Sequence, residues 1–250
     1  MAAYEKFAGL YDALMDDVDY DAWAEYYLAL LASVGVKPGT LCDCACGTGS
    51  LSVRFAARGI RVTGVDLSGD MLEIAQAKAR ERGVRAMFVC QDICALQLPR
   101  PVDTLVCGCD GVNYLLDDDR LNAFFARARA ALRPGGALAF DVSSPWKLRR
   151  TLGNNFFGED RGDVAYLWSN RFDDAAQTVT MDLTFFVEQP DGLYRRFDET
   201  HVQKAHEAGH LLDLLAKNGF AGTRVFGDRT FEAPAADAQR IHMMAVREQK

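Results

Sequence analysis

Short apolar runs alternate with helical patterns over the first 145 residues, and this alternation constrains the fold more than any other feature. The apolar runs have no clean polar face, and short connections join each run to the helical segment that follows it. Strands of this kind build a parallel sheet that helices cover on both faces. The expected strands span residues 40–45, 61–66, 85–91, 104–109 and 137–142, and the expected helices span residues 21–34, 51–58, 70–82 and 117–132.

The pattern changes after Pro145. Between about residues 163 and 204, apolar and polar residues alternate with the period of two that is typical of half-buried strands. We predict a three-stranded antiparallel meander here, part of a cap over residues 146–204 that is inserted into a domain of residues 1–145 and 205–250. A helix over 207–218 and strands near 223–226 and 241–247 complete that domain. A segment inserted at the carboxyl end of a strand lies over the crevice where open α/β sheets bind ligands.

The charge of the chain disfavours two classes of partner. The 250 residues include 28 Lys and Arg against 35 Asp and Glu, a net charge of −7. An acidic surface repels phosphate backbones and anionic lipids, so we expect no nucleic-acid or membrane partner. The amino-terminal residues lack the basic and apolar segments of a secretion signal, and no window approaches the roughly 18 apolar residues of a membrane span. We therefore expect a cytoplasmic protein, and no sequence feature specifies its oligomeric state.

Cysteine and histidine residues invite a metal interpretation, but their spacing argues against it. The seven cysteines are odd in number, and most lie within apolar runs, which favours reduced, buried thiols. Cys42, Cys44 and Cys46 would follow one another along one face of a strand, whereas structural zinc usually takes cysteines presented by a tight turn. The stretch from His206 to His210 matches H-E-x-x-H formally, but it straddles a helix start. We therefore expect no metal site.

The loop after the first strand carries the strongest chemical signal. Gly47 and Gly49 permit a tight turn and let a ligand approach the backbone, and the helix amino terminus behind them suits a polar ligand. Asp66 ends the second strand about 20 residues later, where a carboxylate can accept both hydroxyls of a ribose. A dinucleotide fold requires a third glycine where this chain has Ser52. That difference weakens the interpretation of the chain as a nicotinamide-dependent oxidoreductase, which stays an alternative.

Together with further motifs, this loop resembles that of class I S-adenosylmethionine-dependent methyltransferases of the small-molecule type. Residues 43–49 are similar to the family's D-x-G-x-G-x-G loop, with Ala45 in place of the first glycine. Three further segments match the family in order. The acidic end of its second strand corresponds to residues 66–72, the motif after its third strand to residues 91–93, and its L-x-P-G-G turn to residues 132–136. The resemblance implies a Rossmann-like sheet of seven strands, mostly parallel, with a final antiparallel strand.

The resemblance also implies S-adenosylmethionine as cofactor and a set of residues that bind it. The aspartate after the third strand is expected to hold the adenine amino group, and an amino-terminal aromatic segment is expected to close over the cofactor. Five members have alternative interpretations. Asp43 could cap the loop, Trp23 and Met71 could be core side chains, Tyr11 could pack locally, and Asp92 could be a solvated loop carboxylate. The expected cofactor-binding residues are Tyr11, Trp23, Asp43, Ala45, Gly47, Gly49, Asp66, Leu67, Met71, Gln91, Asp92, Ile93 and Cys109.

The acceptor of the methyl group is expected to be a small molecule. The fourth strand does not end in the Asn/Asp-Pro-Pro-Tyr/Phe motif used on planar amide or nucleobase nitrogens. The aromatic and arginine residues of the cap suit a small, partly apolar acceptor. We expect Asn113 and Tyr114 to orient it, and His201 to accept a proton with a pKa near neutrality. The alternative from another class is a sensor or scaffold that binds S-adenosylmethionine without turnover.

Overall fold

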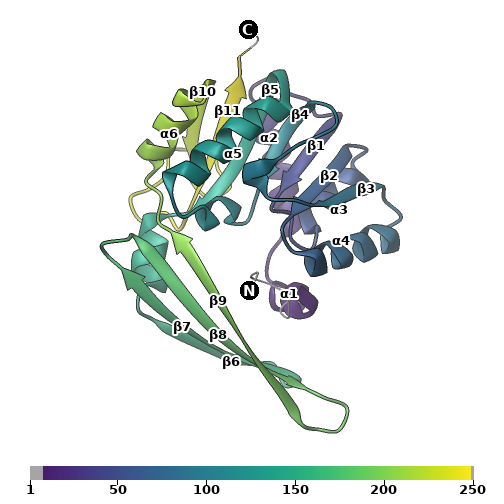
Figure 1. The fold of residues 1–250 in the computed structure, drawn as a ribbon, viewed down its shortest axis with the longest axis vertical. Coiled ribbons are helices and arrows are strands. Elements are labelled where there is room, and N and C mark those ends of the chain that lie inside the picture. The colour runs from purple at the N-terminus through teal and green to yellow at the C-terminus, as the bar shows by residue number, and fades with distance from the viewer. Residues whose placement is uncertain (1–7, 249–250) are drawn as a thin grey trace.

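The computed structural model describes residues 8–248 and contains two sheets (Figure 1). The larger sheet has seven strands in the order β10-β11-β5-β4-β1-β2-β3, and only β11 runs antiparallel to its neighbours. This confirms the predicted Rossmann-like α/β class and the antiparallel last strand. The strands are β1 (Thr40–Cys44), β2 (Arg61–Asp66), β3 (Ala86–Cys90), β4 (Val102–Cys107), β5 (Leu132–Ser143), β10 (Phe220–Phe226) and β11 (Arg240–Arg247).

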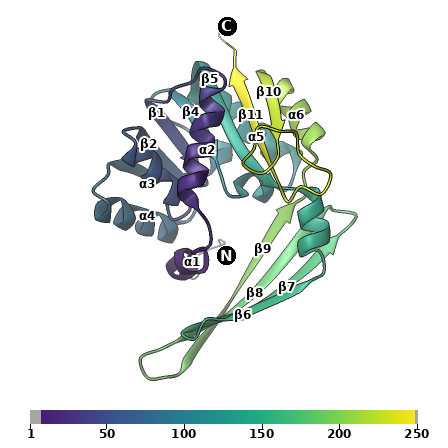
Figure 2. The ribbon, with the colours of Figure 1, turned by 180° about the vertical axis from the view of Figure 1, so that it is seen from behind.

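Helices cover both faces of this sheet, as the apolar runs predicted. On one face, α5 and α6 bury their leucines and phenylalanines against the sheet, and on the other face α2 and α3 do so. Figure 2 shows the α2 face. Local signals begin three helices, since Asp19 caps α2, Ser68 caps α4 and Asp117 caps α5 through their side chains. The helices are α2 (Tyr20–Ala32), α3 (Ser50–Ala57), α4 (Gly69–Glu81), α5 (Asp118–Ala131) and α6 (Ala208–Lys217), with short turns η1 (Ile93–Ala95) and η2 (Gly111–Tyr114).

The second sheet is antiparallel and extends away from the first one (Figures 1 and 2). It has four strands instead of the predicted three. The missed strand lies at the sheet edge with a single neighbour, and it buries little surface: Phe156 is 63% exposed. An edge strand of this kind needs no alternating pattern, so the sequence carried no signal for it. The strands are β6 (Phe156–Asp160), β7 (Val164–Asp173), β8 (Thr178–Glu188) and β9 (Tyr194–Lys204).

The inner face of the inserted sheet contacts the amino-terminal helix α1 (Ala8–Leu14). Phe185 on β8 stacks on Phe197 on β9, with ring centroids 5.1 Å apart. Leu10 and Leu14 of α1 pack against these two rings. The helix therefore lies against the inserted sheet, and its Asp12 also contacts helix α4 and the loop after β1.

All seven cysteines are free thiols, and those at positions 42, 44 and 107 are buried. The Cys42 and Cys44 sulfur atoms lie 3.7 Å apart on one face of β1. Across residues 8–248, none of the helices has the length and apolar character needed to cross a bilayer.

Candidate functional site

A cavity of about 250 Å³ lies where β1, β2 and β4 end, at the carboxyl edge of the parallel sheet. Ligands bind at this edge in open α/β sheets. The structure brings eleven of the thirteen expected cofactor-binding residues into the cavity wall: Tyr11, Asp43, Ala45, Gly47, Asp66, Leu67, Met71, Gln91, Asp92, Ile93 and Cys109.

The other two expected residues lie beside the cavity wall or away from it. Gly49 is the cap of α3 with φ +70°, and a Cβ there would come within 2.8 Å of the Ala75 Cβ, so glycine lets the loop pack on α4. Trp23 is 6% exposed and packs on the His242 ring at 5.4 Å and under the Arg240 guanidinium at 4.9 Å. Its large apolar ring is buried in the core beneath α2, which agrees with the core alternative given for Trp23 in the sequence analysis.

Left-handed backbone conformations shape the loop between β1 and α3. Ala45 and Gly47 both have φ of +53°, and Gly49 has φ of +70°. The Gly49 N–H donates to the Cys46 carbonyl at 2.9 Å, which closes the turn. Ala45 is strained, because a Cβ in the left-handed region contacts the neighbouring carbonyl. It occupies the position where the similar family has its first glycine.

The Ala45→Gly variant is therefore expected to be more stable than the natural chain. Strain of about 1–2 kcal/mol is relieved, and the extra backbone entropy of glycine removes about 0.5–1 kcal/mol of that gain. We expect the free energy of unfolding to rise by about 0.5–1 kcal/mol in urea denaturation. Ala56→Gly within α3 is the control and should lower it by about 1 kcal/mol. A destabilised Ala45→Gly protein would contradict the strain argument.

Asp66 fixes the lip of the cavity by accepting two backbone hydrogen bonds. Its Oδ2 accepts from the Gly47 N–H at 2.8 Å, and its Oδ1 accepts from the Ser68 N–H at 2.9 Å. A carboxylate offers about four lone-pair sites, so about two remain for hydroxyl donors. The carboxylate joins the ends of β1 and β2 and still presents acceptors to the cavity.

Asp43 lies deeper, at the end of β1, and is 1% exposed. Burial raises the pKa of Asp43 to about 7, the nearby Asp66 charge adds to this, and the hydroxyl of Ser52, which donates to Oδ2 at 2.6 Å, opposes it. A cationic group bound next to this carboxyl would favour its ionised form.

Asp92 and Arg120 pair with each other in the cavity wall. Asp92 caps η1 by accepting from the Cys94 N–H at 2.9 Å, and it pairs with the Arg120 guanidinium at 3.0 Å. Burial disfavours the ionised carboxylate, but the Cys94 N–H and Arg120 together hold the pKa of Asp92 below its usual value. Arg120 follows Asp117, the cap of α5, and the sequence alone gave it no reason to face a cavity.

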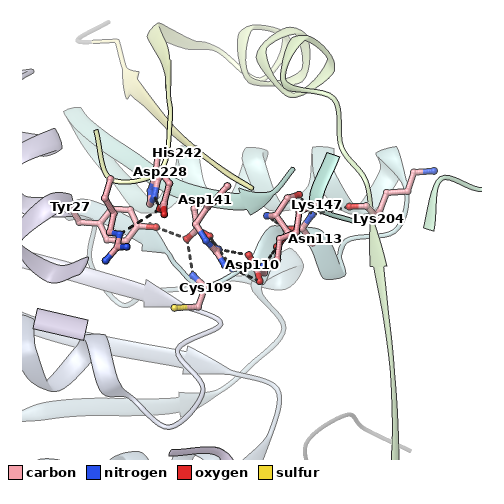
Figure 3. Close-up of polar contacts among 12 residues, drawn as sticks. Tyr27, Cys109, Asp110, Asn113, Asp141, Lys147, Lys204, Asp228 and His242 are labelled. Atoms are coloured by element: carbon pink, nitrogen blue, oxygen red, sulfur yellow. Dashed lines mark hydrogen bonds and ion pairs between the residues drawn. The ribbon is translucent and has the colours of Figure 1, made fainter. Parts of the chain in front are cut away.

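A buried polar network supports the end of β4 (Figure 3). Cys109 and Asp110 both have left-handed backbones, with φ of +55° and +67°. Asp141 on β5 accepts from the Cys109 N–H and from the Tyr27 hydroxyl, each at 2.7 Å. Arg240 on β11 pairs with both Asp110 and Asp141. The network holds in place the two-residue turn through which β4 reaches the cavity.

Asn113, expected to orient the acceptor, has a different role. It is fully buried, its amide donates to the carbonyls of Ser143 at 3.1 Å and Lys204 at 2.9 Å, and its oxygen accepts from the Ser143 N–H at 2.9 Å. Ser143 ends β5 before the inserted sheet, and Lys204 ends β9 after it. Asn113 joins the two ends of the insertion and lies outside the cavity wall.

Tyr114 and His201 lie together where the cavity approaches the inserted sheet. Tyr114 lines the cavity, and its hydroxyl oxygen is 3.5 Å from Nδ1 of His201 on β9. Burial lowers the pKa of His201 to about 4, so the expectation of a near-neutral pKa was wrong. Desolvation disfavours the imidazolium, and the ring is neutral at pH 7. His201 can accept a hydrogen bond there, but it is a weak base.

Ten further residues line the cavity and were not singled out from the sequence. Most are chain neighbours of predicted residues, so extending each motif by one or two positions would have found them. They are Tyr20, Cys46, Thr48, Ser50, Leu51, Ser68, Gly108, Gly111, Leu115 and Arg120. Within the part of the chain that the structure describes, His, Cys, Asp and Glu form no group of three that could hold a metal ion.

The cavity fits a cofactor that joins a nucleoside to an amino acid. Met71, Ile93 and Leu115 provide an apolar wall for a planar base, and Asp66 provides acceptors for a diol. At Gly47 the backbone faces open space without a Cβ, which leaves room for a ligand against the loop.

Comparisons with known proteins agree with this geometry. A family model described as a methyltransferase domain matches residues 41–136. A protein of Geobacillus sp. (strain WCH70) whose name assigns it to the methyltransferases is 37% identical, with 97% of this chain and 98% of that protein covered. The crystal structure of an S-adenosylmethionine-dependent methyltransferase from Clostridium acetobutylicum matches with a TM-score of 0.88 and 32% identity, covering 97% of this chain and 98% of that one.

A more distant relative has a named acceptor. The dTDP-3-amino-3,4,6-trideoxy-alpha-D-glucopyranose N,N-dimethyltransferase of Streptomyces venezuelae is 28% identical, with 83% of this chain and 84% of that protein covered. Similarity to the Geobacillus and Clostridium proteins extends over nearly the whole chain, far beyond the loop motif. The chain therefore belongs to the class I S-adenosylmethionine-dependent methyltransferases.

Proposed function

We propose that this protein transfers the methyl group of S-adenosylmethionine to a small-molecule acceptor that binds between the cavity and the inserted sheet. The observation that carries the proposal is the wall on the acceptor side. Tyr114 lines the cavity, and its hydroxyl meets His201 from β9 of the inserted sheet. We infer that a site bordered by this sheet takes a small molecule in preference to a polymer. The proposal includes the division into a cofactor-binding domain of residues 1–145 and 205–250 and a cap of residues 146–204.

In this proposal, each part of the cavity wall has one task. Asp66 accepts hydrogen bonds from the ribose hydroxyls, and Asp92 and Ile93 hold the adenine against Met71. The glycine loop receives the amino-acid part next to Asp43. S-adenosylmethionine supplies an activated methyl group when it is bound. The chain contributes orientation of the reacting groups and exclusion of water, which account for large rate effects in such transfers.

Two observations support a small, non-polymeric acceptor. The net charge of −7 disfavours binding of a phosphate backbone. The Streptomyces venezuelae relative named above acts on a nucleotide-linked amino sugar, which is a small molecule.

Labelling of a cell extract tests this function. The protein is incubated with extract and methyl-labelled S-adenosylmethionine, and labelled products are separated by size and identified by mass spectrometry. We expect label in the low-mass fraction. Label confined to RNA or protein would overturn the acceptor class, and cofactor binding without any labelled product would favour the sensor alternative.

Tyr114→Phe tests the acceptor side once a product is known. Loss of one hydrogen bond of about 1 kcal/mol should lower the transfer rate about fivefold. The affinity for S-adenosylhomocysteine, measured by calorimetry, should stay unchanged. Tyr194→Phe is the matched control, because the Tyr194 hydroxyl donates to the Gly162 carbonyl at an exposed position of the sheet. Equal rates for all three proteins would remove Tyr114 from the acceptor site.

A further inference from the structure

The helix α1 is attached to the cofactor loop by a compact polar cluster. The Lys78 ammonium on α4 pairs with Oδ2 of Asp12 at 2.7 Å. The Thr48 hydroxyl donates to Oδ1 of Asp12 at 2.7 Å. Lys78 also donates to the hydroxyl oxygens of Thr48 at 3.0 Å and Ser50 at 2.7 Å. Thr48 lies in the loop after β1, Ser50 begins α3, and both line the cavity, so Asp12 connects α1 to the cavity wall.

The same helix is also attached to the inserted sheet, through residues that follow Asp12. Arg161, in the turn between β6 and β7, donates from Nη1 to the Ala13 carbonyl at 2.8 Å and pairs with Asp16 at 3.1 Å. Leu10 and Leu14 pack against the stacked phenylalanines of β8 and β9. The carboxyl end of α1 is therefore held by the sheet on the acceptor side.

The position of α1 depends on these two attachments. The helix has seven residues, and a helix this short has little stability of its own in water. It carries Tyr11, which lines the cavity, while Asp12, Lys78 and Arg161 lie outside the wall. The Lys78 side chain is 14% exposed, so its pairing with Asp12 is screened less than that of an exposed pair.

We propose that α1 couples the cofactor loop to the inserted sheet, with Asp12 and Arg161 as the positioning residues at its two attachments. Closure of α1 on the cofactor loop then orders the inserted sheet, and order in the sheet strengthens cofactor binding. The coupling is reciprocal, because linkage between two sites acts equally in both directions. The inference goes beyond the proposed function and concerns cofactor binding only, whatever the acceptor.

A double-mutant cycle on cofactor affinity tests the coupling. Calorimetry with S-adenosylhomocysteine compares the natural chain with Asp12→Asn, Arg161→Met and the double variant. We expect each single variant to bind about five- to tenfold more weakly, at the low end of allosteric couplings. The affinity of the double variant for S-adenosylhomocysteine should be no lower than that of whichever single variant has the lower affinity, because releasing either attachment already frees α1. Effects that multiply in the double variant would overturn the proposal.

Control variants separate the coupling from a general loss of charge. Arg80→Met, on the same helix as Lys78, and Arg171→Met, on the strand that follows the turn of Arg161, each remove an exposed cation, and both variants should bind S-adenosylhomocysteine as the natural chain does. Lys78→Met tests the loop attachment from its other partner and should reproduce Asp12→Asn. If Arg80→Met or Arg171→Met lost as much affinity for S-adenosylhomocysteine as Asp12→Asn and Arg161→Met do, the proposal would also be overturned.

Hydrogen exchange gives a second readout that a purely local effect would not change. In the natural chain, saturating S-adenosylhomocysteine should slow exchange both in α1 and in the turn between β6 and β7. In Asp12→Asn the ligand should no longer slow exchange in that turn, while the strands of the first sheet keep their protection. Equal slowing of the turn in both proteins would show that α1 does not transmit the effect. The assay needs no acceptor, so its result is independent of the acceptor class.

Discussion

Arg240→Met is expected to lower the free energy of unfolding by about 3–5 kcal/mol at pH 7, as removal of one partner from a buried ion pair does. Arg240 is the cation shared by Asp110 and Asp141. Asp141 is fully buried, and without the guanidinium two carboxylates would face each other in the interior. The turn at Cys109 and Asp110 would also lose its support, so cofactor affinity should fall together with stability. Urea denaturation and calorimetry with S-adenosylhomocysteine measure the two effects.

The pH dependence of this loss has a defined sign. Burial alone would raise the pKa of Asp110, but the charges of Arg240 and Lys147 hold it below its usual value. A lowered folded-state pKa stabilises the protein above the unfolded value of about 4, and this contribution disappears as the pH falls through the folded pKa. In the variant, protonation of Asp110 would instead relieve the repulsion. The difference in unfolding free energy between the two proteins should therefore narrow as the pH is lowered from 7.

A compensating variant provides the control. Arg240→Met combined with Asp110→Asn and Asp141→Asn keeps the side-chain shapes and removes both unpaired charges. It should recover part of the lost stability, because charge burial is the main cost. A loss below about 1 kcal/mol for Arg240→Met, which is the range of an exposed pair, would contradict the role assigned to the network.

Local patterns were sufficient to predict the parallel sheet. Its strands are apolar runs with the period and length of buried strands, and capping residues such as Ser68 and Asp117 mark where helices begin. The edge strand β6 was missed because Phe156–Asp160 buries too little surface to impose a pattern. The inserted sheet as a whole was still predicted, since its other strands alternate.

The candidate site was predicted where its residues follow one another along the chain. The loop at Ala45 and Gly47 and the strand end at Asp66 are short motifs, and all three line the cavity. The network of Arg240 and the attachments of α1 combine residues that are far apart in sequence. A buried aspartate within the apolar strand β5, Asp141, is the one local sign that a partner had to exist.

The low pKa of His201 could not be predicted either. It results from burial between the inserted sheet and η2, which depends on how the two parts of the chain meet. The same holds for Asn113, whose hydrogen bonds close the base of the insertion. Both residues are polar and lie near the end of β4 in space. From the sequence alone, a structural role for such a residue cannot be distinguished from a ligand-binding role.

Asp66→Ala is expected to weaken binding of S-adenosylmethionine by about 5- to 150-fold, which corresponds to about 1–3 kcal/mol. The carboxylate accepts from the N–H groups of Gly47 and Ser68, and in the proposed complex also from the ribose hydroxyls. Its removal leaves these donors without a partner in a partly buried site. Calorimetry on the folded variant measures the change.

Two further variants decide whether the carboxylate itself is responsible. Asp70→Ala removes an exposed carboxylate four residues later, in the first turn of α4, and should leave affinity unchanged. Asp66→Asn keeps one acceptor oxygen but places an NH2 group against a backbone donor. Its affinity for S-adenosylmethionine should therefore lie between that of the natural chain and that of Asp66→Ala. If Asp66→Ala unfolds like the natural chain and binds S-adenosylmethionine equally well, the ribose lies elsewhere. Gly47 and Ser68 would then be the sole partners of Asp66, and its role would be to hold the ends of β1 and β2 together.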